Sequence, residues 1–235
     1  MFYKIILGIL LVQFVVILNL HSEISTLKSD FTRNSKTSEN TLLVSSVNEV
    51  NERLKIVEEG IPELTTRNIK AKIIKDIIKN NIKTSNVDYF KSDRELNEYA
   101  YAVLDSSDKY KIPVSLILAV GRAESNFNAR AISKTKAKGI MQIVDTTFDF
   151  CSKNLNKTNS DVFYVKDSVS CGSFYLRYLL NIFKGDVDLA VKGYNVGFNY
   201  ILKFNGENLP QETQDYHVTV MRFTEAYKSK MYWEK

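Results

Sequence analysis

The run from Ile112 to Val120 constrains the fold more than any other part of the sequence, because apolar residues fill nearly every position of a short helix. Pro113 suits the first turn of that helix, and apolar residues on all sides indicate that the helix is buried. Glu124 then falls in the last turn, where the backbone carbonyls already carry partial negative charge. Burial and this charge both disfavour the ionised form, so the sequence predicts a raised pKa for Glu124 and a proton ready for donation. The alternative is a glutamate that points into solvent or pairs with Arg122.

The composition favours one sizeable, mostly helical domain with additional segments. Of 235 residues, 44% are hydrophobic and 25% charged, and only three prolines and nine glycines argue against a β-sandwich or a long disordered linker. The net charge of +5 comes without an arginine-rich stripe, so we expect no nucleic-acid partner. His21 and His217 are the only histidines, which leaves no material for a histidine-based metal site or catalytic triad.

The amino-terminal segment has the character of a membrane anchor. Residues 5–20 are apolar apart from Gln13 and Asn19, a length between that of a signal-peptide core and that of a full membrane span of about 20 residues. No small-x-small cleavage pattern follows. The sequence therefore predicts an uncleaved transmembrane signal anchor over residues 1–22, with the rest of the chain facing the periplasm or the cell exterior. Secretion after signal cleavage and a buried core helix are the alternatives.

Residues 23–90 are expected to form a tether and a helical stalk. The polar stretch 22–41 lacks periodicity, as in a flexible tether. An apolar repeat at spacings of four and three then predicts a helix over residues 43–64, whose end Gly60 and Pro62 interrupt. This helix either joins two or three chains in a short coiled coil or folds back on the domain. The repeat consists of Leu43, Val47, Val50, Leu54, Val57, Ile61 and Leu64.

A second helix with one apolar stripe is predicted over residues 69–82. Lysines flank the stripe, so the helix either packs its isoleucines on a neighbouring domain and leaves the lysines in water, or lies on an anionic membrane. Packing on a domain is the more common arrangement. The stripe consists of Ile69, Ile73, Ile74, Ile77, Ile78 and Ile82.

A compact domain is predicted over residues 91–235. Ser92 and Glu95 form a capping box that opens a helix to about Tyr110. Residues 126–138 lack a helical period, which predicts a loop or small hairpin that walls one side of a cleft. The inward positions of the first helix are Leu96, Ala100 and Val103.

Further helices are expected from Asp167 to about Phe183 and after Asp186, with Gly185 between them. Asp145 is expected to cap the helix that follows the loop. Cys151 and Cys171 are the only cysteines and lie on consecutive predicted helices. They are either paired in a disulfide, which export would permit, or two buried free thiols.

Four short motifs follow one another in the second half of the chain. They are Glu124-Ser125, Gly139-Ile140-Met141-Gln142, Gly193-Tyr194-Asn195-Val196-Gly197 and Glu212-Thr213-Gln214-Asp215-Tyr216. In order and spacing they resemble the motifs of the soluble lytic transglycosylase family. The resemblance extends from Asp93 to Ala226 and leaves the first ninety residues unexplained.

The resemblance implies a mainly α, goose-type lysozyme-like domain that cleaves peptidoglycan glycan strands without a metal or cofactor. It implies that Glu124, as the single acid and base, cleaves the bond between N-acetylmuramic acid and N-acetylglucosamine and leaves a 1,6-anhydro ring. Met141 would offer a soft apolar contact to a sugar face and Gln142 a donor and an acceptor, although both also suit core filling. The implied substrate-binding residues are Ser125, Ser133, Met141, Gln142, Tyr194, Asn195 and Tyr216.

The sequence departs from the family pattern at four positions. Lys136 and Asp145 stand where the family usually has glycine and proline, and Gly193 and Phe198 replace alanine and proline. We expect these changes to alter local backbone shape and not proton transfer.

Two other functions fit the same residues. A hydrolytic goose-type lysozyme shares the fold and the glutamate, but needs an ordered water and usually a nearby aspartate. A non-catalytic wall-binding subunit would not need to keep the acid. Asp145, Asp149, Asp188 and Glu212 are the candidates for a second carboxylate, and each also suits a cap or a surface charge.

Overall fold

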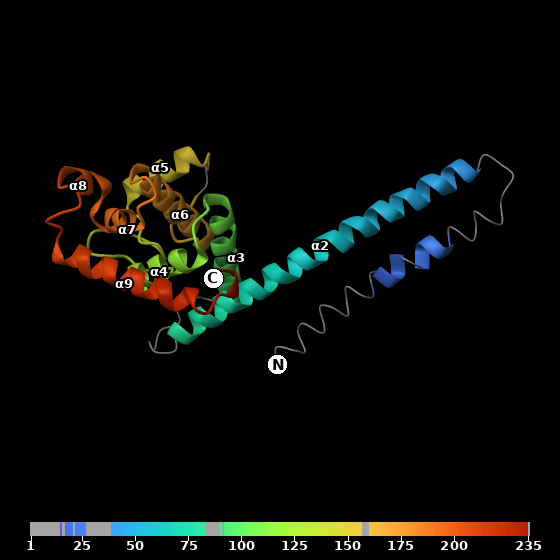
Figure 1. Ribbon diagram of the computed structural model, residues 1–235, viewed down its shortest axis with the longest axis horizontal. Coiled ribbons are helices and arrows are strands. Elements are labelled where there is room, and N and C mark those ends of the chain that lie inside the picture. Colours follow the sequence, from blue (N-terminus) through green and yellow to red (C-terminus); the bar gives the residue numbers. More distant parts are fainter. Residues whose placement is uncertain are drawn as a thin grey trace. The chain divides into compact units, whose positions relative to one another are not determined.

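The structure is a computed structural model that describes residues 15, 17–20, 22–26, 39–82, 90, 92–156 and 160–234 (Figure 1). Contacts divide the chain into two units, Met1–Ile69 and Lys70–Lys235. The helices are α2 (Glu39–Ile82), α3 (Asp93–Tyr110), α4 (Val114–Ser125), α5 (Asp145–Asn154), α6 (Val165–Ile182), α7 (Val187–Val196), α8 (Phe198–Lys203), α9 (Gln211–Lys228) and the 3-10 helix η1 (Tyr232–Glu234). The described part is therefore mainly helical, as the sequence predicts.

The long helix α2 corrects the expectation of two helices separated by Gly60 and Pro62. It runs without a break from Glu39 to Ile82. A proline inside a helix removes one hydrogen bond of the ladder and costs about 3 kcal/mol. Helix α2 nonetheless continues across Pro62.

The described residues of 22–26 are also helical, where a tether was expected. Leu20 and Ile24 form a small buried cluster with Val50 of α2. Most of the expected anchor, residues 1–22, lies outside the described residues. Within the described ranges, no helix combines the length and the apolar character needed to span a bilayer.

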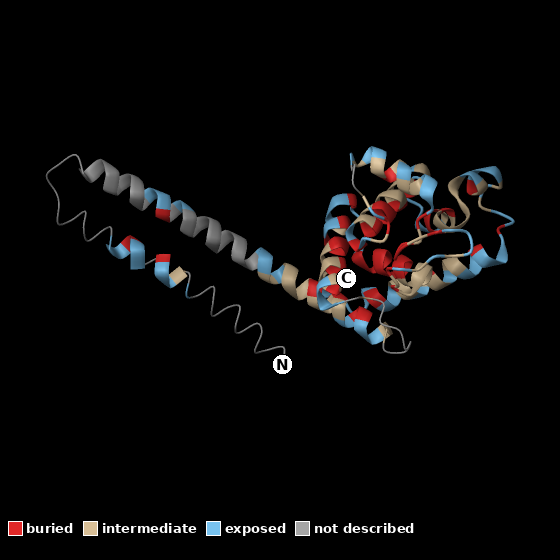
Figure 2. Ribbon diagram, turned by 180° about the vertical axis from the view of Figure 1, so that it is seen from behind, coloured by how far each residue is buried: buried red, intermediate tan, exposed pale blue. Residues whose placement is uncertain are grey.

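The second unit is built around α4. Every residue from Val114 to Gly121 is buried, as the apolar run predicts, and Figure 2 shows the buried residues gathered inside this domain. Helix α9 packs along α4, and α3 packs on α6. The Arg122 guanidinium donates to the Tyr227 hydroxyl at 3.1 Å and lies 3.9 Å from the centroid of the Phe223 ring, which ties α4 to α9.

Side-chain hydrogen bonds cap the amino-terminal ends of α3 and α4. The Ser92 hydroxyl accepts from the Glu95 amide at 3.2 Å, so Ser92 caps α3 as predicted. The Glu95 carboxylate, the other half of the expected capping box, accepts from Arg130. At the other end of the chain, the Glu234 carboxylate accepts from the Ser115 amide at 3.2 and 3.3 Å. Helix α4 has no side-chain cap from its own N-cap residue, Pro113, so Glu234 supplies one from the opposite end of the chain.

The isoleucine stripe packs on the domain, as expected. Ile74, Ile77 and Ile78 belong to the main hydrophobic core, while Lys79 pairs with Asp93 at 3.0 Å on the surface. These contacts explain why the compact unit begins at Lys70, ahead of residue 91, where the sequence placed it.

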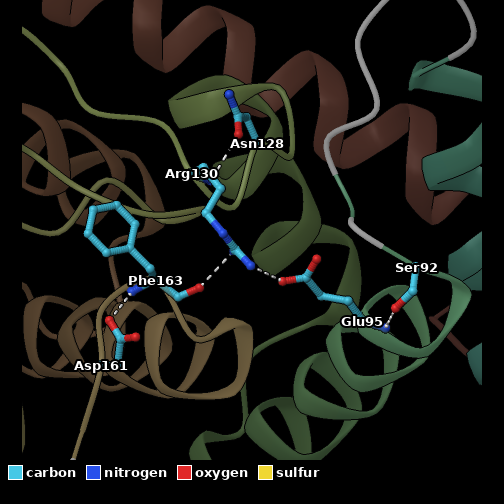
Figure 3. Close-up of polar contacts among 6 residues, drawn as sticks. All are labelled: Ser92, Glu95, Asn128, Arg130, Asp161 and Phe163. Atoms are coloured by element: carbon cyan, nitrogen blue, oxygen red, sulfur yellow. Dashed lines mark hydrogen bonds and ion pairs between the residues drawn. The ribbon is translucent and has the colours of Figure 1, made fainter.

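Arg130 holds together the loop that follows α4. Its guanidinium donates to Glu95 of α3 at 2.7 Å and to the Phe163 carbonyl oxygen at 3.0 Å, and its amide donates to Asn128 at 2.9 Å (Figure 3). Two isolated β-bridges, Ile132 with Lys138 and Lys138 with Ile143, shape the rest of the loop. The predicted loop with hairpin character is therefore present.

Helices α5 to α7 complete the domain. Cys151 of α5 and Cys171 of α6 are joined in a disulfide. Asp186 caps α7 by accepting from the Leu189 amide at 2.9 Å, as expected. The expectation that Asp145 caps α5 is wrong, because Asp145 is the first helical residue and its carboxylate accepts from Lys138 at 2.7 Å. The first helical position also suits the proline that the family has there.

Candidate active site

Glu124 lies in the last turn of α4, where the helix stops. Asn126 and Phe127 have positive φ angles of 52° and 66°, so the chain leaves the helical path directly after Ser125. The Ser125 hydroxyl donates to the Ile140 carbonyl oxygen at 2.8 Å. Ser125 therefore fixes the end of α4 to the next loop, and its hydroxyl is engaged inside the protein.

Burial controls the protonation of Glu124. Loss of hydration raises the pKa of its carboxyl group to about 8, and the Tyr216 hydroxyl opposes this shift by donating to Oε1 at 2.6 Å. The residue as a whole stays partly exposed, as a group that meets a substrate must be. The raised pKa agrees with the sequence-based expectation, and Arg122 contacts Tyr227 in place of Glu124.

Two tyrosines, Tyr194 and Tyr216, interact electrostatically with the Glu124 carboxyl group. Burial raises the pKa values of Tyr194 and Tyr216 well above the ordinary range, and the charge of Glu124 raises them further. Both hydroxyls therefore stay protonated and act as neutral donors. Tyr216 donates to Glu124, and Tyr194 donates to the Met141 carbonyl oxygen at 3.0 Å.

Met141 is buried, which fits core filling, the alternative that the sequence left open for it. Its side chain is 0% exposed and lies against α6 at Gly172. A Cβ atom at Gly172 would lie 2.8 Å from the Met141 methyl and from the Tyr194 hydroxyl, and 2.9 Å from the Met141 Cβ. Glycine is therefore required for this close approach, and Met141 positions Tyr194 through its backbone carbonyl.

Gln142 and Ser133 shape the loop. The Gln142 amide donates to the carbonyl oxygens of Gly139 at 2.8 Å and Ala131 at 3.2 Å, so its donor hydrogens are used inside the protein. The Ser133 hydroxyl accepts from the Ala137 amide at 3.0 Å. Both residues stabilise the loop that follows α4, and among the described residues neither is hydrogen-bonded to Glu124.

Asn195 is oriented by a residue that the sequence reasoning missed. Thr213 of α9, which is 1% exposed, donates to Asn195 Oδ1 at 2.8 Å. This bond leaves the amide hydrogens of Asn195 for another acceptor. The signal was present, since Thr213 belongs to the motif that ends in Tyr216. Ser168, also missed, is fully buried and accepts from the Met141 amide at 3.3 Å.

No second carboxylate acts on Glu124 in the described part of the chain. Only burial and Tyr216 contribute to its shift in pKa. Asp145 pairs with Lys138 and Asp188 with His217, while Asp149 and Glu212 are exposed. Over the same residues, no group of three metal-binding side chains comes together.

One pocket among the described residues lies apart from these side chains. It has a volume of about 330 Å³, and none of the expected site residues lines it. Its walls come from α7, α9 and the loop between α8 and α9: Lys192, Gly206, Asn208, Leu209, Gln214, His217 and Val218.

Comparison with known proteins connects this geometry to a family. Residues 102–217 match the family model of the transglycosylase SLT domain. The fold is similar to that of a 70-kDa soluble lytic transglycosylase solved in complex with bulgecin A, with 21% identity and a TM-score of 0.53 over 57% of this chain and 25% of that one. It is also similar to an inactive mutant of the lytic transglycosylase Slt from Pseudomonas aeruginosa, with 17% identity and a TM-score of 0.53 over 80% of this chain and 36% of that one. The chain thus spans about a third or less of the length of these solved proteins.

Proposed function

Because residues 102–217 belong to the transglycosylase SLT family, we propose that this chain is a peptidoglycan lytic transglycosylase with Glu124 as its acid and base. The observation that carries the proposal is the environment of Glu124. Burial raises its pKa to about 8, so the carboxyl group holds a proton at neutral pH, and Tyr216 is placed to stabilise the anion that remains after donation. One side chain therefore has the properties of an acid and, afterwards, of a base.

In the proposed reaction, Glu124 first donates its proton to the glycosidic oxygen between N-acetylmuramic acid and N-acetylglucosamine. The bond from that oxygen to C1 breaks, and the substrate's own 2-acetamido group stabilises the positive charge at C1. The ionised Glu124 then removes the proton of the C6 hydroxyl, whose oxygen attacks C1 and closes a 1,6-anhydro ring. Glu124 ends protonated, as it began, and no water is consumed.

Among the described residues, only burial and Tyr216 shift the pKa of Glu124, which fits a route that needs a single carboxyl group. Glycosidases ordinarily use two carboxyl groups, one of which activates water or attacks the sugar. Here the nucleophile belongs to the substrate, and an intramolecular hydroxyl competes at an effective concentration far above that of free water. The solved Pseudomonas aeruginosa relative is inactive with a glutamate replaced by glutamine, which is in keeping with an essential glutamate.

Degradation of purified peptidoglycan sacculi by the full-length protein tests the proposal. Glu124→Gln keeps the shape of the side chain and loses the transferable proton, so we expect the rate to fall about 100- to 10,000-fold. Glu212→Gln, an exposed change on α9, serves as the matched control and should retain the wild-type rate. More than a tenth of the wild-type rate in a folded Glu124→Gln variant would exclude Glu124 as the acid.

The location and organisation of the chain belong to the same proposal. We propose a catalytic domain over residues 91–235, a stalk over 23–90 and an anchor over 1–22 that holds the enzyme at the membrane, facing the periplasm or cell exterior. Self-association through residues 43–64 would follow from the apolar repeat. Recovery of the full-length protein in the membrane fraction, with Met1 intact, supports the anchor, whereas an amino terminus near Glu23 would show a cleaved signal.

A further inference from the structure

A continuous line of aromatic rings leads away from the site. The Tyr194 ring lies 5.6 Å from Tyr175, centroid to centroid, and Tyr175 lies 6.2 Å from Tyr178 with the two planes only 19° apart. Tyr178 in turn contacts Phe150 at 5.1 Å and Phe198 at 5.9 Å. We call Phe150, Tyr175, Tyr178 and Phe198 the aromatic ledge. Its rings come from α5, α6 and α8.

The ledge is not simply part of the core. All four residues are partly exposed, and Phe150 and Tyr178 do not belong to the apolar side chains that pack on the main core cluster. Among the described residues, the hydroxyls of Tyr175 and Tyr178 have no hydrogen-bond partner. Half-buried tyrosine hydroxyls usually find a partner, so these two are available to a ligand.

The ledge continues directly from the site of Glu124. Tyr194 links the two, since the charge of Glu124 contributes to its raised pKa while its ring contacts Tyr175. Tyr194 is therefore the common neighbour of Glu124 and of the ledge.

One ring of the ledge stands at a departure from the family pattern. Phe198, where the family usually has proline, begins α8 directly after Gly197, whose φ of 87° turns the chain out of α7. This turn brings the Phe198 ring onto Tyr178 at an interplanar angle of 85°. The ledge in this form thus depends on a residue that the family pattern does not supply.

We propose that the aromatic ledge binds pyranose rings of the glycan strand beyond the scissile bond, as an additional subsite for β-1,4-linked N-acetylhexosamines. This inference rests on the proposed function, because it takes the glycan strand as the substrate. Aromatic faces pair with the apolar faces of sugar rings, and the tyrosine hydroxyls supply polar contacts at the edge. No ledge side chain carries a charge at neutral pH, which suits uncharged sugars better than the peptide stems of the cell wall.

Calorimetric binding of chitotriose and chitohexaose to the full-length Glu124→Gln protein tests the ledge without turnover. Adding Tyr178→Ala should weaken hexamer binding about fivefold or more, and trimer binding less. Adding Tyr178→Phe should weaken hexamer binding by a smaller factor, because the ring remains and only the hydroxyl is lost. Tyr232→Ala, the same truncation at an exposed tyrosine of η1, is the matched control and should leave both affinities unchanged.

Equal hexamer affinity with and without Tyr178→Ala would overturn the subsite, as would an equal loss in the Tyr232→Ala control. Because Tyr178→Phe keeps the ring packing, a hydroxyl effect in that variant stands even if Tyr178→Ala unfolds. Product formation in the same samples reports separately on Glu124: cleavage by the Glu124→Gln protein would reject the proposed acid and leave the length dependence of binding measurable.

Discussion

At Glu124, two opposing effects set a useful pKa. Burial raises it and the hydrogen bond from Tyr216 lowers it, with burial the larger effect. Without Tyr216, the anion formed after proton donation would lose the hydroxyl that donates to it directly. Without burial the proton would be lost far below neutral pH. The pair therefore allows one carboxyl group to act in both steps.

The pH dependence of kcat/KM follows from this balance. The protonated acid is lost as pH rises through about 8, so activity should fall on the basic side with an apparent pKa near that value. Tyr216→Phe removes the effect that lowers the pKa, and the basic limb should move to higher pH while the rate decreases. The profile is measured on soluble glycan fragments.

Tyr227→Phe is the control for this experiment, because it also removes a phenolic hydroxyl on α9, but one that contacts Arg122. Its basic limb should stay in place. A limb that does not move in Tyr216→Phe would show that Glu124 does not control the pH dependence.

Lys136 carries backbone strain that a single change should relieve. Its φ of 64° lies in the left-handed region, where glycine is preferred and where the family pattern has glycine. Lys136→Gly should therefore raise the free energy of unfolding by up to about 1 kcal/mol, measured by denaturant titration. Lys134→Gly, at an ordinary φ in the same loop, should lower it, and an equal effect of both changes would exclude the strain.

The sequence predicted where Glu124 lies, but not how the side chains of Met141 and Gln142 are oriented. The apolar run and the motifs placed Glu124 at the end of a buried helix. For Met141 the sequence left sugar contact and core filling both open, because its burial depends on the close approach of α6 at Gly172. The engagement of Gln142 likewise depends on how the loop folds back on its own carbonyl oxygens.

At the scale of elements, the sequence predicted those helix ends that are capped by a residue close by in the chain. It did not predict the end of α4, which is capped by a distant residue. The cap at Ser92 and the cap at Asp186 were readable because each involves residues three positions apart. The cap of α4 by Glu234 spans 119 residues and leaves no local pattern. The continuity of α2 through Pro62 was likewise missed, because Gly60 and Pro62 are local signals for a helix end. The structure shows one helix from Glu39 to Ile82.

Removal of the distant cap should destabilise α4. Glu234→Ala leaves the Ser115 amide without its partner and removes a negative charge from the amino-terminal end of a buried helix. We expect a loss of about 0.5 to 2 kcal/mol in the free energy of unfolding. Thermal and denaturant unfolding of Glu234→Ala are compared with those of Glu225→Ala, an exposed change on α9. Identical stability of the two variants would contradict the capping role.

At the scale of the whole molecule, a disulfide and the isoleucine stripe of α2 both stabilise the unit Lys70–Lys235. The isoleucines of α2 extend the core, and the Cys151–Cys171 bond fixes α5 on α6, the helix that carries Gly172 and two rings of the ledge. The sequence left a disulfide and two free thiols both open, because spacing along the chain does not show whether the two cysteines meet.

Loss of this disulfide should lower the stability of the whole unit. The bond closes a loop of 20 residues, and a loop of this size is worth roughly 3 kcal/mol. Cys151→Ser with Cys171→Ser should therefore melt at a lower temperature than the oxidised wild type, and reduction of the wild type should give a similar decrease. Both thiols freely alkylated in unfolded, unreduced protein from an oxidising compartment would show that the bond does not form.

The chemical form of the product separates the two enzymatic functions most directly. Mass spectrometry of muropeptides released from purified sacculi by the full-length protein distinguishes them by one molecule of water. If Glu124 acts alone as acid and base, the muramic acid ends should carry a 1,6-anhydro ring and no reducing group. Predominantly reducing muramic acid ends would contradict the transglycosylase mechanism and identify a hydrolase of the lysozyme type.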